Sequence, residues 1–399
     1  MEVKKSNVIH MKPAAEEKSR SESTVPVTRK HHFDFPLFIV LMLICAFGIV
    51  MLFSASYYYA QSRYGDGLKY VKSQLMYLGM GIAVLLVLSH VKYTVYKKLS
   101  IVAYLVLIAL LVATLVFGSD ANGAQRWLHL GFIDLQPSEL AKFVLVVVAA
   151  TVMTNKQNKM DRFWQGIVPL LVYMLIPCAL IILQPNLSMV IIIGLTTFFM
   201  LYLGGAKWWH LFLMFAVGAV AVLLLAVIEP YRFARLKTLW DPWSDPTGDG
   251  YQIIQSLYAF GNGGVFGQGL NYSRQKLLFL PYRESDFIFS IIGEELGFFG
   301  CIGLLLAYLF VIYRGIRIAM RCRDRFGSLT AAGITGVLAI QVIINVAVVT
   351  NSVPATGQTL PFISAGGTSL LVFMAAMGIL LNISRYTELK AEVNTDDEE

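Results

Sequence analysis

The sequence predicts an all-α protein that crosses a membrane about ten times. Of its 399 residues, 57% are hydrophobic and only 14% are charged, whereas about a quarter of a soluble globular domain is charged. Apolar stretches of about 18–25 residues recur along the chain, and a helix needs this length to cross the hydrocarbon core. The loops between these stretches differ in Lys and Arg content, as loops on the two sides of a membrane do.

The predicted transmembrane helices follow one another along most of the chain. They lie near residues 36–57, 74–91, 99–118, 138–154, 165–183, 187–204, 209–229, 286–313, 329–351 and 368–385. Residues 1–33 are polar, mixed in charge and without the apolar core of a signal peptide, which predicts a disordered tail. Residues 387–399 form a short acidic tail. Residues 34–386 are therefore expected to form one membrane domain, with a large loop over 230–285.

Lys and Arg are concentrated in the short loops on one side of this bundle. The loops "VKYTVYKK", "NKQNKMDR", "GGAKWW" and "RGIRIAMRCRDR" hold twelve of them, and the short loops on the other side hold about four. Cytoplasmic loops carry such an excess of positive charge, so both termini are expected in the cytoplasm. The loops 119–137, 230–285 and 352–367 are then outside. No basic stripe with interleaved aromatic residues is present, so no nucleic-acid partner is expected.

Four acidic residues mark the outer end of the eighth predicted helix. Glu284 and Asp286 stand at its mouth, and Glu294 and Glu295 follow about two turns further along. An ionised carboxylate near hydrocarbon costs about 2.5–3.5 kcal/mol, so each needs a physical reason. Asp286 either caps the helix start or serves as a functional carboxylate, with Glu284 as the secondary candidate. The two deeper acids are expected to pack against polar groups of neighbouring helices.

The large outer loop supplies cations and glycines. Arg232, Arg235 and Lys237 form a basic cluster, which either anchors lipid head groups or recognises an anionic substrate. Residues 251–260 predict a short interfacial or re-entrant helix. The glycine-rich run 261–269 that follows either makes turns or brings backbone N–H groups close to a phosphate.

Three further features lie near predicted helix ends. Gly366 and Gly367 lead into the tenth helix, where a helix N-terminus can hold an anion and where the next hydroxyl residues can cap the helix. Glu139 and Lys142 are three residues apart on the fourth helix and so share a face, which predicts mutual neutralisation inside the bundle. Lys72, at the outer end of the second helix, is a further cation that can face the same outward-facing cavity as these residues.

One carboxylate surrounded by cations and glycine-rich backbone suits a particular class of reaction. In glycosyl transfer from a lipid-linked pyrophosphate sugar, the leaving group needs charge neutralisation and the attacking hydroxyl needs a general base. One carboxylate and several cations can supply both. A glycosidase usually needs two carboxylates at a set distance, so these residues favour a transferase.

Long motifs over residues 34–386 carry a resemblance to a known family. They read, in order, "NGAQRW", "QPSELAK", "LQPNLSM", "GYQIIQSLYAFGNGGVFGQG", "SDFIFSIIGEELG", "TGQTLPFISAGGTSLL" and "NISRY". The sequence resembles the SEDS family (shape, elongation, division and sporulation), the FtsW/RodA/SpoVE group of bacterial peptidoglycan glycosyltransferases. Within it, "TGQTLPF" and "NISRY" look most like the division and sporulation members FtsW and SpoVE. The resemblance implies a ten-helix SEDS fold in the bacterial plasma membrane.

The resemblance also implies an activity and its partners. The substrate would be lipid II, a disaccharide-pentapeptide on undecaprenyl pyrophosphate, which is polymerised with inversion into a β-1,4 glycan. The catalytic aspartate of the family's "DFIF" motif falls on Asp286, and an intramembrane structural ion pair falls on Glu139 and Lys142. The implied partners are a class B penicillin-binding protein, which is a transpeptidase, and other divisome membrane proteins at the division septum, within the membrane lipid.

Roles for individual residues follow as expectations. Asp286 would deprotonate the acceptor hydroxyl or hold a divalent cation, Mg²⁺ or Mn²⁺, beside the pyrophosphate, and no other cofactor is expected. Gly366 and Gly367 would let backbone approach the substrate. Cationic candidates for binding the pyrophosphate or the peptide carboxylates are Lys72, Arg126, Arg232, Arg274 and Lys276.

The sequence departs from the family's pattern ahead of the aspartate and at two other motifs. The usual acid and histidine of "LPEAHTDFIF" are here Tyr282 and Glu284, so a role for that histidine does not transfer. Asn186 replaces an acid in "QPNLSM", and Ala365 replaces an aromatic residue in "SAGGTS". Two rival functions remain for the same pocket, a lipid II flippase or transporter and a non-catalytic division scaffold. The hydropathy pattern shows no inverted repeat of the kind that many transporters have.

Overall fold

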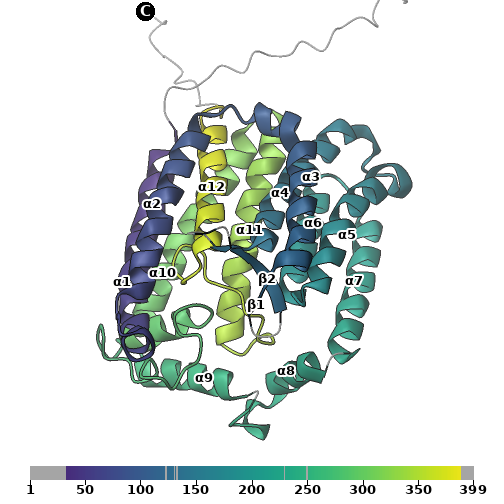
Figure 1. The fold of residues 1–399 in the computed structure, drawn as a ribbon. Coiled ribbons are helices and arrows are strands. Elements are labelled where there is room, and N and C mark those ends of the chain that lie inside the picture. The colour runs from purple at the N-terminus through teal and green to yellow at the C-terminus, as the bar shows by residue number, and fades with distance from the viewer. Residues whose placement is uncertain are drawn as a thin grey trace, which may run out of the picture.

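The computed structural model of the protein describes residues 33–387, except residues 122–123, 130, 132–133, 229 and 249. It is a bundle of long helices with further short elements at one end (Figure 1). Residues 33 and 387 lie at the opposite end, which we call the terminal end. The end that carries the short elements is the loop end. The expected tails 1–32 and 388–399 lie outside the described residues.

The long helices account for most of the described chain. They are α1 (Phe35–Tyr64), α2 (Lys69–His90), α3 (Thr94–Phe117), α4 (Pro137–Asn155), α5 (Val168–Leu183), α6 (Leu187–Leu203), α7 (Trp208–Ile228), α10 (Ile288–Arg321), α11 (Arg325–Val349) and α12 (Gly367–Ser384). Within the described residues, nine helical segments are long and apolar enough to cross a membrane, and α6 is a shorter apolar helix. The prediction of about ten spans is thus confirmed, and α6 was among the shortest of the predicted stretches.

Local sequence signals explain where several of these helices begin and end. The Asp34 side chain accepts a hydrogen bond from the Leu37 N–H at the start of α1, and Gly65 ends that helix in the left-handed conformation. Asn186 caps α6 in the same way, by accepting from the Met189 N–H. This cap gives Asn186 a structural role at the start of α6.

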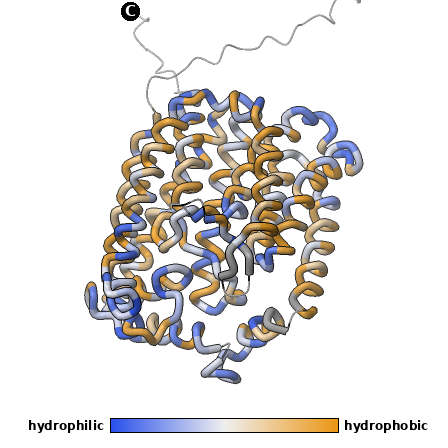
Figure 2. Tube along the Cα trace, in the orientation of Figure 1, coloured by the Kyte–Doolittle hydropathy of each residue, from blue (hydrophilic) through white to orange (hydrophobic). Residues whose placement is uncertain are grey.

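Hydropathy varies along the bundle axis. The helices are mostly hydrophobic, and hydrophilic residues gather at the two ends (Figure 2). In the central helices α4 and α12, 72% and 78% of the residues in the most apolar stretch are buried inside the protein. In α7 only 6% of the residues in the corresponding stretch are buried. The helix α7 therefore lies at the edge of the bundle, and α4, α11 and α12 form its centre.

The loop end is built from elements that the sequence predicted only in part. The helices α8 (Pro230–Trp240) and α9 (Tyr251–Gly263) lie across this end (Figure 1). The helix α9 confirms the short helix expected at 251–260, whereas α8 was not predicted. The strands β1 (Ser119–Ala121), β2 (Ala124–His129) and β3 (Asp134–Leu135) form an unpredicted antiparallel sheet in the order β1-β2-β3. The segment 350–366 leads from α11 into α12, which begins part-way along the bundle.

Candidate active site

Asp286 lies at the loop end, two residues before α10 begins at Ile288. The cap position of α10 belongs to Phe287, and no side chain caps this helix by a hydrogen bond. Capping therefore does not account for the aspartate. Its carboxyl is partly buried and faces Gly357, where an added Cβ would lie 3.4 Å from the Asp286 Oδ2 and the backbone φ is +67°. A glycine at position 357 thus leaves the space beside this carboxylate open.

The backbone around Asp286 is fixed by three elements that are distant in sequence. The carbonyls of residues 284–286 each accept one hydrogen bond. The donors are the Ala365 N–H at 2.8 Å, the Ser364 hydroxyl at 2.6 Å and the Asn345 side-chain amide at 2.9 Å. The segment 350–366 and α11 therefore hold the peptide that carries the carboxylate.

The surroundings of Asp286 make it a better base than an ordinary aspartate. Loss of hydration raises its pKa to about 6, an effect opposed by the positive charge of Arg235 and by the Ser285 hydroxyl and reinforced by the negative charge of Glu284. Arg235 comes from α8 and donates a hydrogen bond to the Ala355 carbonyl at 2.9 Å. It belonged to the predicted basic cluster, but nothing in the sequence singled it out from its neighbours.

Glu284, the secondary candidate, has a different environment. Burial raises its pKa, and the nearby Arg283 guanidinium opposes that rise. One carboxyl oxygen, Oε2, is buried and has no hydrogen-bond partner among the described residues. Arg283 itself is buried and lies over the ring of Tyr59, 4.6 Å from its centroid. Glu284 therefore influences the charge state of Asp286, and it also acts on Tyr70 of α2.

The predicted ion pair between Glu139 and Lys142 is present in the centre of the bundle. The Lys142 Nζ lies 2.8 Å from the Glu139 Oε2 and also donates to the Gln341 Oε1 at 2.6 Å. Both side chains are almost completely buried. Charges buried in this way persist only when they are paired, so α4 and α11 are joined here by a neutralised polar contact.

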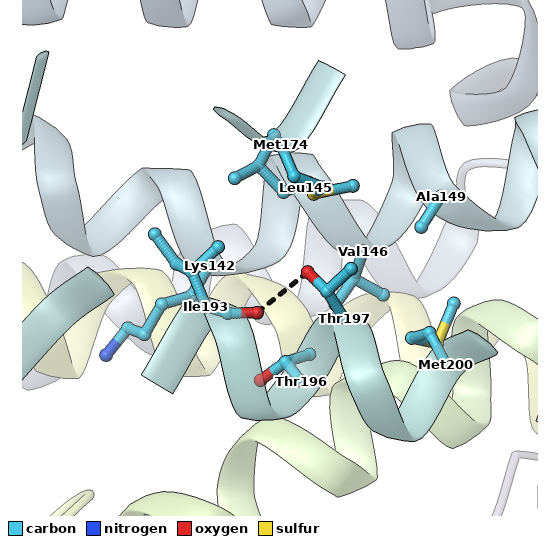
Figure 3. A pocket seen from close by; sticks show the side chains of 9 residues that line it. All are labelled: Lys142, Leu145, Val146, Ala149, Met174, Ile193, Thr196, Thr197 and Met200. Carbon is cyan, nitrogen blue, oxygen red and sulfur yellow. Dashed lines mark hydrogen bonds between the residues drawn. The ribbon is translucent and has the colours of Figure 1, made fainter. Parts of the chain in front are cut away.

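Two hollows elsewhere in the described residues do not add to this site. The first, of about 10 Å³, holds at most one water and is lined mainly by apolar side chains of α4, α5 and α6. Thr196 and Thr197 are the hydroxyl-bearing residues that line this hollow, and Figure 3 shows the Lys142 nitrogen directed away from them. The second, of about 670 Å³, lies between α6, α10 and α11 and has an apolar lining without titratable groups.

Lys276, a predicted substrate cation, lies in a buried ion pair. Its Nζ lies 2.8 Å from the Glu295 Oε1 and also donates to the Ser54 hydroxyl and the Asn271 side chain. Glu294 accepts from the backbone N–H groups of Arg274 and Gln275. The two adjacent acids of α10 thus hold the segment 271–276 against the helix. Polar partners on neighbouring helices were expected, and Ser54 of α1 and Asn262 of α9 are such partners, but most of the partners lie in this loop segment.

The glycine-rich run 261–269 packs against a kink in α10. The kink lies at Gly297, whose φ is +66°, and the freed carbonyls of Glu294 and Glu295 accept from the N–H groups of Gln268 and Gly269. A Cβ on Gly267 would lie 2.2 Å from the Glu295 oxygen. These glycines therefore permit a close backbone approach, and the N–H groups of residues 267–269 are already bonded within the protein.

The remaining predicted cations are spread over the loop end. Lys72 is exposed and pairs with Asp66 at 2.9 Å, while Arg126 donates to the carbonyls of Gln184 and Pro185 in the turn between α5 and α6. Arg274 is exposed, and its side chain makes no hydrogen bond or ion pair within the described part of the chain. The side chain of Arg232 lies outside the described residues.

The two glycines at the start of α12 have different surroundings. A Cβ on Gly367 would lie 2.2 Å from the Tyr77 ring, so this glycine lets α2 and α12 pack closely. Gly366 occupies the cap position of α12, which receives no side-chain cap. The Thr368 hydroxyl instead donates to the Asp134 carbonyl of β3.

The described residues offer a divalent ion little beyond Asp286. Nowhere within them do three His, Cys, Asp or Glu side chains come together as a metal site would require. Mg²⁺ is often held by one or two carboxylates together with substrate phosphates. Asp286 fits such a site only as a single protein ligand that shares the ion with a bound phosphate.

Comparisons with known proteins identify close relatives over nearly the whole chain. The family model FtsW/RodA/SpoVE, described as cell cycle protein, matches residues 35–389. Stage V sporulation protein E of Bacillus subtilis is 38% identical over 362 residues, which are 90% of this chain and 99% of that protein. A probable peptidoglycan glycosyltransferase FtsW of Trichlorobacter lovleyi is 39% identical over 89% of this chain and 94% of its own.

Solved structures show the same fold. A chain of a peptidoglycan synthase complex, whose structure concerns the coordination of polymerization and crosslinking, is 30% identical with a TM-score of 0.74 and covers 88% of this chain and 98% of its own. The rod shape determining protein RodA of Thermus thermophilus is 28% identical with a TM-score of 0.67, and covers 88% of this chain and 97% of its own.

Proposed function

The chain belongs to the FtsW/RodA/SpoVE family, known as SEDS, and we propose that it is a peptidoglycan glycosyltransferase that polymerises lipid II with Asp286 as its general base. The observation that carries the proposal is the environment of Asp286. Its carboxyl is partly buried, faces a glycine and has a pKa raised to about 6. Its relatives include probable peptidoglycan glycosyltransferases, which supports the same activity.

Asp286 would remove the proton from the attacking sugar hydroxyl. A general base is most effective when its pKa lies near the working pH, and a pKa of about 6 leaves Asp286 mostly ionised at pH 7. The hydroxyl oxygen then bonds to the anomeric carbon, and the bond from that carbon to the pyrophosphate oxygen breaks. Attack on an α-linked donor from the opposite face gives a β-linked product, so the proposed reaction inverts the anomeric centre.

The departing pyrophosphate needs positive charge rather than a proton. Arg235 reaches the surroundings of Asp286 from α8, so we assign it as the cation that neutralises this anion. Two cations remain candidates for binding the peptide carboxylates of the substrate. These are Arg274, which is exposed, and Lys72, whose pairing with Asp66 is also exposed. Lys276 is better explained by its buried pairing with Glu295.

The orientation in the membrane and the partner are parts of the same proposal. The Lys and Arg residues of the terminal end favour a cytoplasmic location for that end, and Asp286 would then face the outer surface. Likeness to a chain of a peptidoglycan synthase complex supports partnership with a class B penicillin-binding protein. We propose a role in division or sporulation, because SpoVE and FtsW are among the relatives.

Glycan synthesis from labelled lipid II tests this function. The purified protein, alone and with its transpeptidase, is incubated with lipid II, with and without Mg²⁺ or Mn²⁺, and the products are separated on a gel. We expect a ladder of glycans that a muramidase specific for β-1,4 linkages degrades. Absence of any ladder, together with movement of lipid II across the bilayer of proteoliposomes, would instead establish a transporter.

A further inference from the structure

Two amides on one face of α11 connect the buried ion pair with the candidate base. Gln341 and Asn345 are four residues apart, so they lie one above the other on the helix. Both side chains are completely buried. No feature of the sequence motifs drew attention to either residue, because amides in an apolar helix carry no charge and occur at no diagnostic spacing.

Gln341 joins the ion pair to the segment 350–366. Its Oε1 accepts from the Lys142 Nζ at 2.6 Å, and its Nε2 donates to the Thr359 carbonyl at 3.0 Å. A flipped amide would place an N–H beside the lysine ammonium and an oxygen beside a carbonyl, so these partners fix its orientation. The Thr359 peptide therefore has a defined position relative to α4.

Asn345 joins the same segment to the peptide of the candidate base. Its Nδ2 donates to the Asp286 carbonyl at 2.9 Å and to the Gln358 carbonyl at 2.7 Å. Its Oδ1 is buried without a hydrogen-bond partner among the described residues. An unsatisfied buried oxygen is costly, so this orientation is maintained by the two donated bonds rather than by the acceptor.

We propose that Gln341 and Asn345 are positioning residues that set Asp286 in its reactive geometry relative to the buried Glu139–Lys142 pair. Lys142 bonds to both Glu139 and Gln341, and Gln341 bonds to the Thr359 carbonyl. The adjacent Gln358 carbonyl bonds to Asn345, which also bonds to the Asp286 carbonyl. The inference rests on the proposed glycosyl transfer, in which a base displaced by about 1 Å can cost about a hundredfold in rate. Substrate binding, which the proposed function assigns to Arg235 and to the exposed cations, is little affected.

The test compares Asn345 with an amide that is equally buried but lies elsewhere. Asn382, near the terminal end, is 1% exposed and donates its Nδ2 to the Ser89 carbonyl at 2.9 Å. The variants Asn345→Leu and Asn345→Asp are matched by Asn382→Leu and Asn382→Asp, and Gln341→Glu removes the donor to Thr359 while it retains an acceptor for Lys142. Each is assayed as full-length protein for kcat and KM with lipid II, per folded molecule.

A second readout does not depend on activity. Backbone hydrogen exchange is followed at the Leu360 and Ala365 N–H groups, which bond to the Ser364 hydroxyl and the Glu284 carbonyl. We expect faster exchange there in the variants at positions 341 and 345, and unchanged exchange in those at 382. We also expect kcat to fall at least about tenfold relative to the matched Asn382 variant, with KM within about twofold.

The outcomes separate this inference from the proposed function. Equal kcat values for the two asparagine sets, or unchanged exchange at Leu360 and Ala365, would overturn the positioning role. Absence of polymer from the wild-type protein would defeat the proposed function, and the exchange rates alone would then decide whether the two amides hold these segments together.

Discussion

Two opposing influences act on the carboxyl of Asp286. It lies at a helix start, where the helix dipole usually favours the ionised form, yet its loss of hydration dominates and raises its pKa to about 6. The sequence identified the residue, but it gave no means to weigh dipole against desolvation. That balance depends on Gly357 and Arg235, which approach from other parts of the chain, and on the partly buried Glu284 two residues away.

The raised pKa of Asp286 has a defined consequence for the pH dependence of the reaction. A general base acts in its ionised form, so kcat/KM should be constant above about pH 7 and should fall about tenfold per unit below about pH 6. Initial rates of lipid II polymerisation between pH 4.5 and 8.5 measure this limb. Rates that stay nearly constant down to about pH 4.5, as the usual aspartate pKa near 4 would give, would show that burial does not control this group.

The same shift predicts the sign of a stability effect. Because the pKa of Asp286 is higher in the folded protein than in the unfolded chain, its protonated form is favoured by folding, and this contribution is lost as pH rises through about 6. The variant Asp286→Asn should therefore raise the melting temperature at pH 8 and leave it nearly unchanged at pH 4. The corresponding gain in the free energy of unfolding at pH 8 is at most roughly 3 kcal/mol. A variant less stable than wild type at pH 8 would contradict this.

Arg235 should affect both substrate affinity and the base. Its positive charge lowers the pKa of Asp286, so Arg235→Gln should move the acidic limb of the rate profile to higher pH. It should also raise KM about tenfold or more, the effect of losing a hydrogen bond to a charged group. Lys237→Gln removes the same charge from the exposed face of α8, where that side chain lies over Phe233, and should change neither quantity. Equal effects of the two variants would indicate a general surface potential instead.

Among the elements, α10 shows most clearly why acidic residues occur near the end of an apolar helix. The helix kinks at Gly297, the backbone of 264–269 fills the kink, and the adjacent carboxylates hold the segment that follows. The pattern of the sequence correctly suggested polar packing for Glu294 and Glu295. It did not reveal the kink, because a glycine in an apolar stretch is compatible with a straight helix.

The buried pair formed by Lys276 and Glu295 can be distinguished from a substrate contact by mutation. Removal of one partner from a buried pair costs about 3–5 kcal/mol, whereas replacement of both by uncharged groups is often nearly neutral. Lys276→Met and Glu295→Gln should each lower the melting temperature, and the double variant should recover most of the loss with a normal KM. If Lys276 bound the pyrophosphate, the single Lys276→Met and the double variant would both show a raised KM for lipid II.

Other elements show what sequence patterns omit. The helices α1 and α10 extend to Tyr64 and Arg321, beyond the predicted apolar stretches, because polar turns outside the hydrocarbon can remain helical. The sheet β1-β2-β3 consists of very short strands, and α8 contains a basic cluster that hydropathy alone does not separate from a loop. Such elements depend on tertiary contacts, which the local hydrophobic periodicity of the sequence does not reveal.

At the scale of the whole molecule, the prediction succeeded where hydrophobicity and length decide the structure. The bilayer requires long apolar helices, so their number and order could be inferred from the length and position of the apolar stretches. The site could be inferred only as a set of charged and small residues on the loops of one end. Its assembly depends on contacts between α8, α11 and the segments 282–287 and 350–366, which lie more than 50 residues apart in some cases.

The central claim is that this loop end is a catalytic site built around one carboxylate, and a comparison of two acids tests it directly. Initial rates of lipid II polymerisation are measured for the wild type, Asp286→Asn and Asp66→Asn, each normalised to folded protein. Asp66 lies at the same end but is exposed and pairs with Lys72. We expect Asp286→Asn to lose at least about a hundredfold in rate and Asp66→Asn to retain nearly wild-type activity. Undiminished polymerisation by Asp286→Asn would show that another group, with Glu284 as the next to examine, serves as the base.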